Sequence, residues 1–140
     1  YDAMTWQVIH GDYYPGNLLV GPDARISAIL DWDFAGPHWR ELEVARGAVE
    51  CALTSVGGIA RGRLAAFVEA YSELSPLTAP QRRRMFRLWF NYMLWSLYPV
   101  TLRYKPGADL PREFERLARR RHAMLTLVGS HLEALEGGTV

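Results

Sequence analysis

The 140-residue sequence has little cysteine, little lysine and no long apolar run. Cys51 is the single cysteine, so no disulfide can form within the chain, and we expect a reducing, cytoplasmic location. No apolar run reaches the length of about 18 residues that a membrane-spanning helix needs, so we expect no membrane partner. Hydrophobic residues make up 49% of the chain and charged residues 22%, which is typical of a chain with a packed core.

Charge of each sign is concentrated in a different half of the chain. Residues 1–60 carry eight acids and three arginines, a net charge of −5, whereas residues 61–121 carry thirteen bases and five acids, a net charge of +8. The basic half includes arginine triplets at 82–84 and 119–121. A helical module that binds nucleic acid is therefore one candidate function class. On a helix, however, each triplet would point in three directions and would not form one patch.

One motif indicates phosphoryl-transfer chemistry. The tripeptide His-Gly-Asp occupies residues 10–12, Asn17 follows Asp12 by five positions, and Asp31 ends a later apolar run. Phosphoryl transfer requires an Asp near the attacking hydroxyl, and an amide oxygen and a second carboxylate to hold the Mg²⁺ that neutralises the phosphate. Asp12, Asn17 and Asp31 can fill these three roles.

The residues around the motif predict a β-hairpin that brings these side chains together. Residues 6–9 are aromatic and β-branched and predict a strand that leads into the motif. Pro15 and Gly16 predict a tight bend, after which residues 18–20 and 25–30 form the two arms of a hairpin. The residue after the second arm, Asp31, should then lie beside the bend.

The motif at residues 10–17 and the sequence Ile-Leu-Asp-Trp-Asp at 29–33 together resemble the aminoglycoside phosphotransferase superfamily. This superfamily also includes homoserine, choline and methylthioribose kinases. The resemblance is specific because two separate motifs agree in order and spacing.

The resemblance implies a role for each residue of the two motifs. Asp12 would be the catalytic base or the residue that orients the hydroxyl, and Asn17 and Asp31 would be magnesium ligands. His10 would support the loop backbone. Asp33 matches a position that is frequently acidic, and we include it as a supporting residue.

The resemblance also implies a fold: the α+β C-terminal lobe of a protein-kinase-like enzyme. Residues 1–36 would form the catalytic-loop and metal-binding hairpin region, and residues 37–140 a mostly helical subdomain of the same lobe. A kinase-like enzyme has a glycine-rich loop and a strand lysine before its catalytic loop. Here Lys105, the single lysine, comes far after it. We therefore expect a fragment that lacks the N-terminal nucleotide lobe.

The function implied is transfer of the γ-phosphate of ATP, with Mg²⁺, to a hydroxyl of a small metabolite. We expect the chain to be inactive alone and either to self-associate or to need the missing lobe. A kinase-like module that binds or regulates without catalysis is the alternative, and a nucleic-acid-binding module is less favoured. Because the second half of the chain is basic, a neutral or anionic acceptor such as homoserine or a sugar is favoured over a polycationic aminoglycoside.

After the motifs, the apolar period changes to that of helices. We expect a break at residues 34–37 and a helix over 41–53. A second helix follows, and a third begins with a capping box formed by Thr78 and Gln81. A last helix should run from about residue 111 to Gly137.

Four sets of side chains accompany these helices. The first helix should bury Leu42, Ala45, Val49 and Ala52, the second Leu64, Phe67, Val68 and Tyr71, and the last Phe114, Leu117, Ala118, Leu125, Val128 and Leu132. The third carries Met85, Phe86, Trp89, Phe90, Tyr92, Met93, Trp95 and Tyr98. Such aromatic stripes are more often core than cleft lining. His38 and Trp39 could border a cleft.

Overall fold

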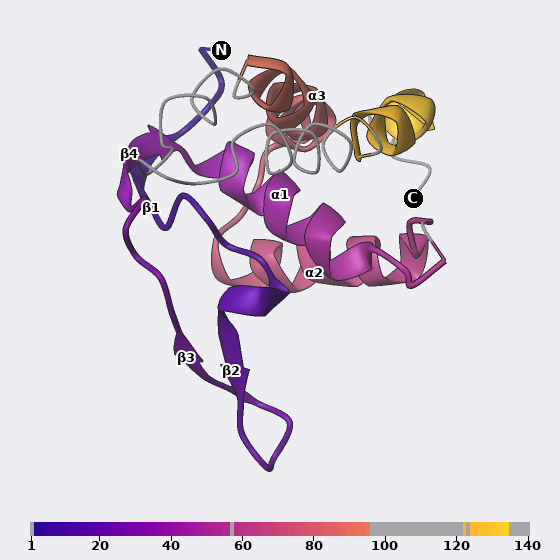
Figure 1. Ribbon diagram of the computed structural model, residues 1–140. Coiled ribbons are helices and arrows are strands. Elements are labelled where there is room, and N and C mark those ends of the chain that lie inside the picture. The colour runs from indigo at the N-terminus through magenta and orange to yellow at the C-terminus, as the bar shows by residue number, and fades with distance from the viewer. Residues whose placement is uncertain (1, 57, 96–121, 123, 135–140) are drawn as a thin grey trace, which may run out of the picture.

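The computed structural model describes residues 2–56, 58–95, 122 and 124–134, which form an α+β fold (Figure 1). Its elements in chain order are β1 (Trp6–Ile9), the 3-10 helix η1 (Pro15–Asn17), β2 (Leu18–Val20), β3 (Ile26–Ile29), β4 (Gly36–Trp39), α1 (Arg40–Ala52), α2 (Arg61–Leu74) and α3 (Ala79–Trp95). Residues 124–134 are also helical. A hairpin and a second antiparallel strand pair therefore accompany a helical body, and the sequence predicts the hairpin and the helices.

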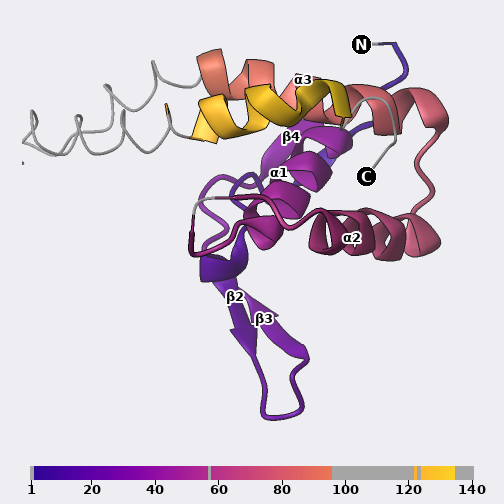
Figure 2. The ribbon, with the colours of Figure 1, turned by 90° about the vertical axis from the view of Figure 1, so that its right-hand side faces the viewer.

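Strands β2 and β3 form the predicted hairpin. They pair antiparallel, with Leu18 opposite Ile29, and an irregularity in register follows Leu19. The turn between them is closed by a hydrogen bond of 2.8 Å from the N–H of Gly21 to the carbonyl oxygen of Arg25. Both views show the hairpin projecting away from the helices (Figure 1, Figure 2).

Strand β4 corrects the expectation of a break that includes Gly36 and Pro37. These residues pair antiparallel with β1, Gly36 with Ile9 and Pro37 with Val8. Proline lacks a backbone N–H, so a turn was the local expectation. A pair of strands has two edges, however, and an edge strand tolerates proline where the missing N–H would face outward. The pairing to β1, about 30 residues earlier in the chain, decided the local structure here.

Helix α1 is the centre of the helical body. It packs against both α2 and α3, and also contacts β1 and β4. The predicted inward face is confirmed, because Ala45, Val49 and Ala52 are completely buried and Leu42 is nearly so. Small side chains on this face allow the neighbouring helices to approach closely.

Helices α2 and α3 complete the core around α1. In α2, Leu64 and Val68 are buried and Phe67 and Tyr71 pack against the core from its edge. The capping box of α3 is confirmed: the Thr78 N–H donates to Gln81 Oε1 at 2.7 Å, and the Gln81 N–H donates to Thr78 Oγ1 at 3.4 Å.

The aromatic stripe of α3 is mainly core. Met85, Phe86 and Trp89 are buried, as a packing role predicts, whereas Tyr92 is exposed. Met124, Val128 and Leu132 of the final helical segment are buried in the same core. The side chain of Trp95 and residues 96–121, which include Tyr98, Lys105, the arginines at 119–121 and the start of the predicted last helix, lie outside the described residues. None of the described helices is long and apolar enough to span a bilayer.

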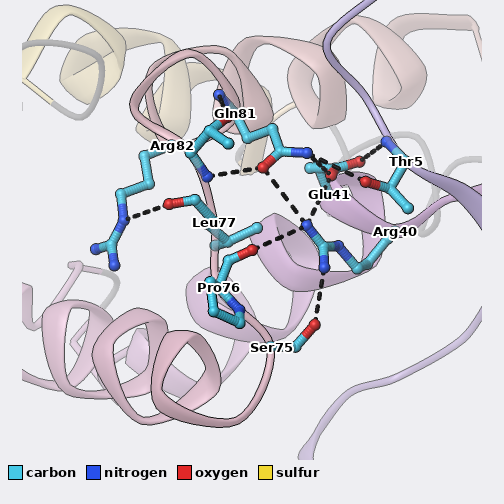
Figure 3. Close-up of polar contacts among 9 residues, drawn as sticks. Thr5, Arg40, Glu41, Ser75, Pro76, Leu77, Gln81 and Arg82 are labelled. Carbon is cyan, nitrogen blue, oxygen red and sulfur yellow. Dashed lines mark hydrogen bonds and ion pairs between the residues drawn. The ribbon is translucent and has the colours of Figure 1, made fainter.

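A buried polar network ties the first residues of the chain to the helical body (Figure 3). Glu41 of α1 has no exposed surface. Its carboxylate accepts hydrogen bonds from the Thr5 N–H at 2.9 Å and from Gln81 Nε2 at 2.8 Å, and it pairs with Arg40 at 3.2 Å. Arg40 also donates to Ser75 Oγ at 2.8 Å. One carboxylate therefore connects the segment before β1 with α1 and α3.

The strands expose many large apolar side chains. Two of these residues, Trp6 and Val8, lie on β1 and are 60% and 68% exposed. The others lie on the hairpin and the segment that follows it: Leu19, Val20, Ile26, Ile29, Leu30, Trp32 and Phe34. We call these nine residues the apolar strand surface. Large apolar side chains exposed in such number along neighbouring segments often mark binding partners or further parts of a protein.

Candidate active site

Strand β1 leads into a tight loop at residues 10–17, which ends in η1. Gly11 has a φ of 80°, in the left-handed region that favours glycine. A Cβ atom at this position would overlap the carbonyl oxygen of Phe34. Glycine therefore allows the loop to pass close to the segment that follows β3.

Two charged side chains of α1 hold the backbone of this loop. The Glu43 carboxylate accepts hydrogen bonds from the N–H of His10 at 3.0 Å and from the N–H of Gly11 at 2.6 Å. Arg46 Nη1 donates to the Gly11 carbonyl oxygen at 2.8 Å. Because α1 lies at the centre of the body, these contacts fix the loop relative to the core.

Asp12 and Asn17 meet across the bend, as their spacing predicts. Asn17 Nδ2 donates to Asp12 Oδ2 at 3.1 Å and to the main-chain oxygen of Asp12 at 2.9 Å. Arg46 Nη2 forms an ion pair with Asp12 Oδ1. The side chains of Asp12 and Arg46 are 24% and 25% exposed, so the Asp12 carboxylate is held on two sides and still reachable from solvent.

His10 is buried behind the loop and connects it to the end of β3. Its Nδ1 accepts a hydrogen bond from the Asp12 N–H at 3.2 Å. Since an accepting nitrogen carries no proton, Nε2 holds the proton and donates it to the Leu30 carbonyl oxygen at 2.8 Å. The imidazole therefore holds the backbone of Asp12 and of the residue before Asp31 at a fixed separation.

Asp31 comes directly after Leu30, whose backbone is hydrogen bonded to the loop. The Leu30 N–H donates to the Asn17 carbonyl oxygen at 2.8 Å, which brings the chain at Asp31 to the side of Asn17. Asp31 adopts a left-handed φ of 61°, a conformation that is uncommon outside glycine and occurs often at functional sites. Asp31 and Asp33 are both exposed, and neither carboxylate has a hydrogen-bond or ion-pair partner among the described residues.

His38 and Trp39 lie on β4, and their neighbours include Trp6 at the start of β1 and Tyr92 near the end of α3. The His38 ring stacks on Trp6 with centroids 5.7 Å apart and meets the edge of Tyr92 at 5.5 Å. Burial lowers the pKa of His38, which favours the neutral imidazole. These contacts are with aromatic side chains outside the loop at residues 10–17.

A comparison with known protein families identifies the family to which this chain belongs. The model of the phosphotransferase enzyme family matches residues 2–86, which include the whole loop, Asp31 and the α1 residues that hold the loop. The chain belongs to the phosphotransferase enzyme family.

Three individual proteins are similar to most of this chain. The homoserine kinase of Methylobacillus glycogenes is 26% identical over 137 residues, with 89% of this chain and 42% of that protein covered. The homoserine kinase of Burkholderia ambifaria is 27% identical over 139 residues, covering 88% and 42%. An uncharacterised protein of Synechocystis is 24% identical over 125 residues, covering 89% and 33%. The chain thus spans about two fifths of these homoserine kinases. No solved structure matches it.

The donor set at the loop suits the Mg²⁺ that phosphotransferases use. The amide nitrogen of Asn17 is hydrogen bonded to Asp12, and its amide oxygen faces away from that bond and has no hydrogen-bond partner among the described residues. The Asp31 carboxylate is likewise unpaired among the described residues. No three His, Cys, Asp or Glu side chains of the described residues gather as a metal site. One carboxylate and one amide are still a fitting pair, because Mg²⁺ keeps several waters and binds substrate phosphates.

Sequence reasoning missed Glu43 and Arg46. Both lie three residues apart on α1, so they share a helix face, and this spacing was the available signal. A charged pair on a helix usually faces solvent, however, and only the packing of α1 against the loop shows otherwise. Tyr13, also in the loop, packs against α1 and α2, and burial raises the pKa of its phenol, with Cys51 and Glu43 adding to the effect.

Proposed function

We propose that the chain carries the catalytic loop and the metal ligands of an ATP-dependent phosphotransferase that acts on a hydroxyl of a small molecule. The observation that carries the proposal is the geometry of the loop. Asp12 and Asn17 are hydrogen bonded to each other, and the residue before Asp31 is hydrogen bonded to Asn17. Membership of the phosphotransferase family supports the same function.

Asp12 is the proposed partner of the acceptor hydroxyl. Its carboxylate oxygens each retain a lone pair beyond the bonds to Arg46 and Asn17, so they can accept a hydrogen bond from the hydroxyl. An oriented hydroxyl oxygen can then attack the γ-phosphorus in line. His10 supports this arrangement through the Asp12 backbone, and Asp33 would add negative charge close to the metal ligands.

Asn17 and Asp31 are the proposed ligands of Mg²⁺. When bound, Mg²⁺ supplies positive charge that neutralises the oxygens of the transferred phosphate. The two residues contribute different things: Asn17 presents an amide oxygen fixed by its bonds to Asp12, and Asp31 presents a charged carboxylate.

Asp31→Ala is expected to lower the Mg²⁺ affinity of the chain by at least about tenfold, because it removes the carboxylate of the proposed site. Isothermal titration with MgCl₂ measures the affinity. Asp31→Asn is a companion variant, since asparagine tolerates the left-handed backbone and still lacks the charge. Asp23→Ala, in the exposed turn of the hairpin, is the matched control. Equal affinity of Asp31→Ala and the unmodified chain would contradict the assignment.

The proposed acceptor is a small hydroxylated metabolite that is neutral or anionic, with an amino-acid alcohol first among the candidates. The similarity to two homoserine kinases supports this class. The charge of +8 over residues 61–121 favours it over a polycationic acceptor. Phosphorylation of homoserine, choline, sugars and aminoglycosides, assayed side by side, would distinguish the acceptors.

A further part of a longer polypeptide is the proposed partner of the apolar strand surface. The matched homoserine kinases are more than twice as long as this chain, and a nucleotide-binding lobe would supply the glycine-rich loop and strand lysine that residues 1–11 do not contain. Covering the strands would remove the exposed tryptophans and aliphatic side chains from water.

Without that part, the 140-residue chain is expected to self-associate through the apolar strand surface, because association buries it. Sedimentation velocity over a wide concentration range should show an average mass that rises with concentration. Val8→Thr and Val20→Thr should reduce association, whereas Leu74→Thr, which changes a still more exposed apolar side chain on α2, should not. A single monomeric species at high concentration would argue against the proposal.

A further inference from the structure

Arg46 contacts the proposed catalytic carboxylate, although it takes no part in the proposed transfer of phosphate. Its guanidinium makes two contacts in the loop, with Asp12 Oδ1 through Nη2 and with the Gly11 carbonyl oxygen through Nη1. The other carboxylate oxygen of Asp12 accepts from Asn17 Nδ2 at 3.1 Å. Both oxygens of Asp12 therefore face a donor of the protein, although the side chain is still 24% exposed.

These contacts matter because Asp12 is hydrogen bonded to Asn17, and the Leu30 N–H, one residue before Asp31, is hydrogen bonded to the main chain of Asn17. Asp12, Asn17 and Asp31 are all suitable ligands for a divalent cation, and a second carboxylate would normally strengthen its binding. A cation that took Asp12 as a ligand would remove it from the acceptor hydroxyl. Catalysis therefore requires an interaction that prevents the cation from binding Asp12.

Arg46 can provide this interaction. A guanidinium keeps its positive charge at every physiological pH, so it repels a cation that approaches Asp12 and satisfies the carboxylate at the same time. Its second bond, to the Gly11 carbonyl oxygen, fixes the planar group in place. Arg46 also arises from α1, whose neighbouring residues Ala45, Gly47 and Ala48 are buried. It is therefore anchored to the core of the molecule.

We propose that Arg46 is a positioning residue that keeps Asp12 out of the metal site and so reserves its carboxylate for the acceptor hydroxyl. This inference rests on the proposed function, because it assumes that Asn17 and Asp31 hold the cation. It adds a specific division of roles: Asn17 and Asp31 bind the cation, and Arg46 of α1 prevents Asp12 from binding it.

Metal affinity distinguishes this role from a merely structural one. If Arg46 only stabilised the loop, its replacement would loosen the site and weaken cation binding. If Arg46 keeps the cation away from Asp12, its replacement frees the Asp12 carboxylate and removes the positive charge that repels the cation. Cation binding then becomes stronger. The two roles predict changes of opposite sign.

The test uses Mn²⁺ alone as the probe, bound to the 140-residue chain and followed by water-proton relaxation. Arg46→Met should bind Mn²⁺ about tenfold or more tightly than the unmodified chain. The gain should vanish in the double variant Asp12→Asn/Arg46→Met, because the freed ligand is then absent. Arg46→Lys, which keeps the charge, should stay close to the unmodified chain. Arg83→Met, which removes an exposed charge from α3, is the control for net charge.

A second measurement does not depend on the stability of the Arg46 variants. In the unmodified background, Asp12→Asn should bind Mn²⁺ no more weakly, because Asp12 is not a metal ligand there. Weaker binding by Asp12→Asn, or binding by a folded Arg46→Met variant that is equal to or weaker than that of the unmodified chain, would overturn the inference. Failure of the proposed function shows differently: Mn²⁺ binding by the unmodified chain would then not depend on Asp31.

Discussion

Glu41→Ala should lower the free energy of unfolding by about 3–5 kcal/mol, because it removes one partner of a buried ion pair. Arg40 would keep a largely buried guanidinium without its carboxylate, and the Thr5 N–H and the Gln81 amide would each lose an acceptor. Small domains have a total stability of about 5–15 kcal/mol, so the loss is a large part of what holds the chain folded.

Urea denaturation followed by tryptophan fluorescence measures this loss as a lower midpoint. Glu73→Ala is the matched control, since this carboxylate is exposed on α2. Glu41→Gln should fall between the two, because an amide has one oxygen where the network requires two acceptors. If Glu41→Ala and Glu73→Ala unfold at the same urea concentration, the network does not stabilise the fold as we describe.

Asp12→Asn should reduce turnover about 10²- to 10⁴-fold in a parent polypeptide that joins this chain to a nucleotide-binding lobe. Asparagine has nearly the same shape but no charge, so it orients the acceptor hydroxyl poorly. Nucleotide affinity should change little, because Asn17 and Asp31 are the proposed metal ligands. Such a lobe is added for the measurement because residues 1–11 contain no lysine or glycine-rich loop to contact the phosphates.

Steady-state kinetics with ATP and the acceptor, together with nucleotide titration, separate these effects. A large fall in kcat with an unchanged dissociation constant for the nucleotide is the expected result. Asp23→Asn in the hairpin turn is the control, with activity equal to that of the parent. Equal turnover of Asp12→Asn and the parent would favour a binding module without catalysis over a phosphotransferase.

Local sequence was sufficient wherever a residue's neighbours along the chain decide its conformation. The strand before the motif, the bend at Pro15 and Gly16, and the β2–β3 hairpin follow from propensity and turn chemistry. The capping box of α3 and the buried face of α1 follow in the same way from helix spacing. The contact between Asp12 and Asn17 also belongs here, since five residues separate them.

Contacts between segments that are distant in the sequence could be found only from the tertiary structure. Glu43 and Arg46 reach the loop from more than 30 residues away, and a charged side chain on a helix carries no local sign of whether it faces solvent or another segment. β4 was missed for a related reason, because pairing with β1 outweighed the local signal of Gly36 and Pro37.

The sequence by itself determined the order and spacing of the oxygen-bearing residues, because these depend on bends of a few residues. Only the tertiary structure decided how they are held. The packing of α1 brings a carboxylate to the loop backbone and a guanidinium to Asp12. The positions of these side chains depend on the free energy of packing the whole of α1 against the rest of the molecule. A short segment of sequence does not reveal that free energy.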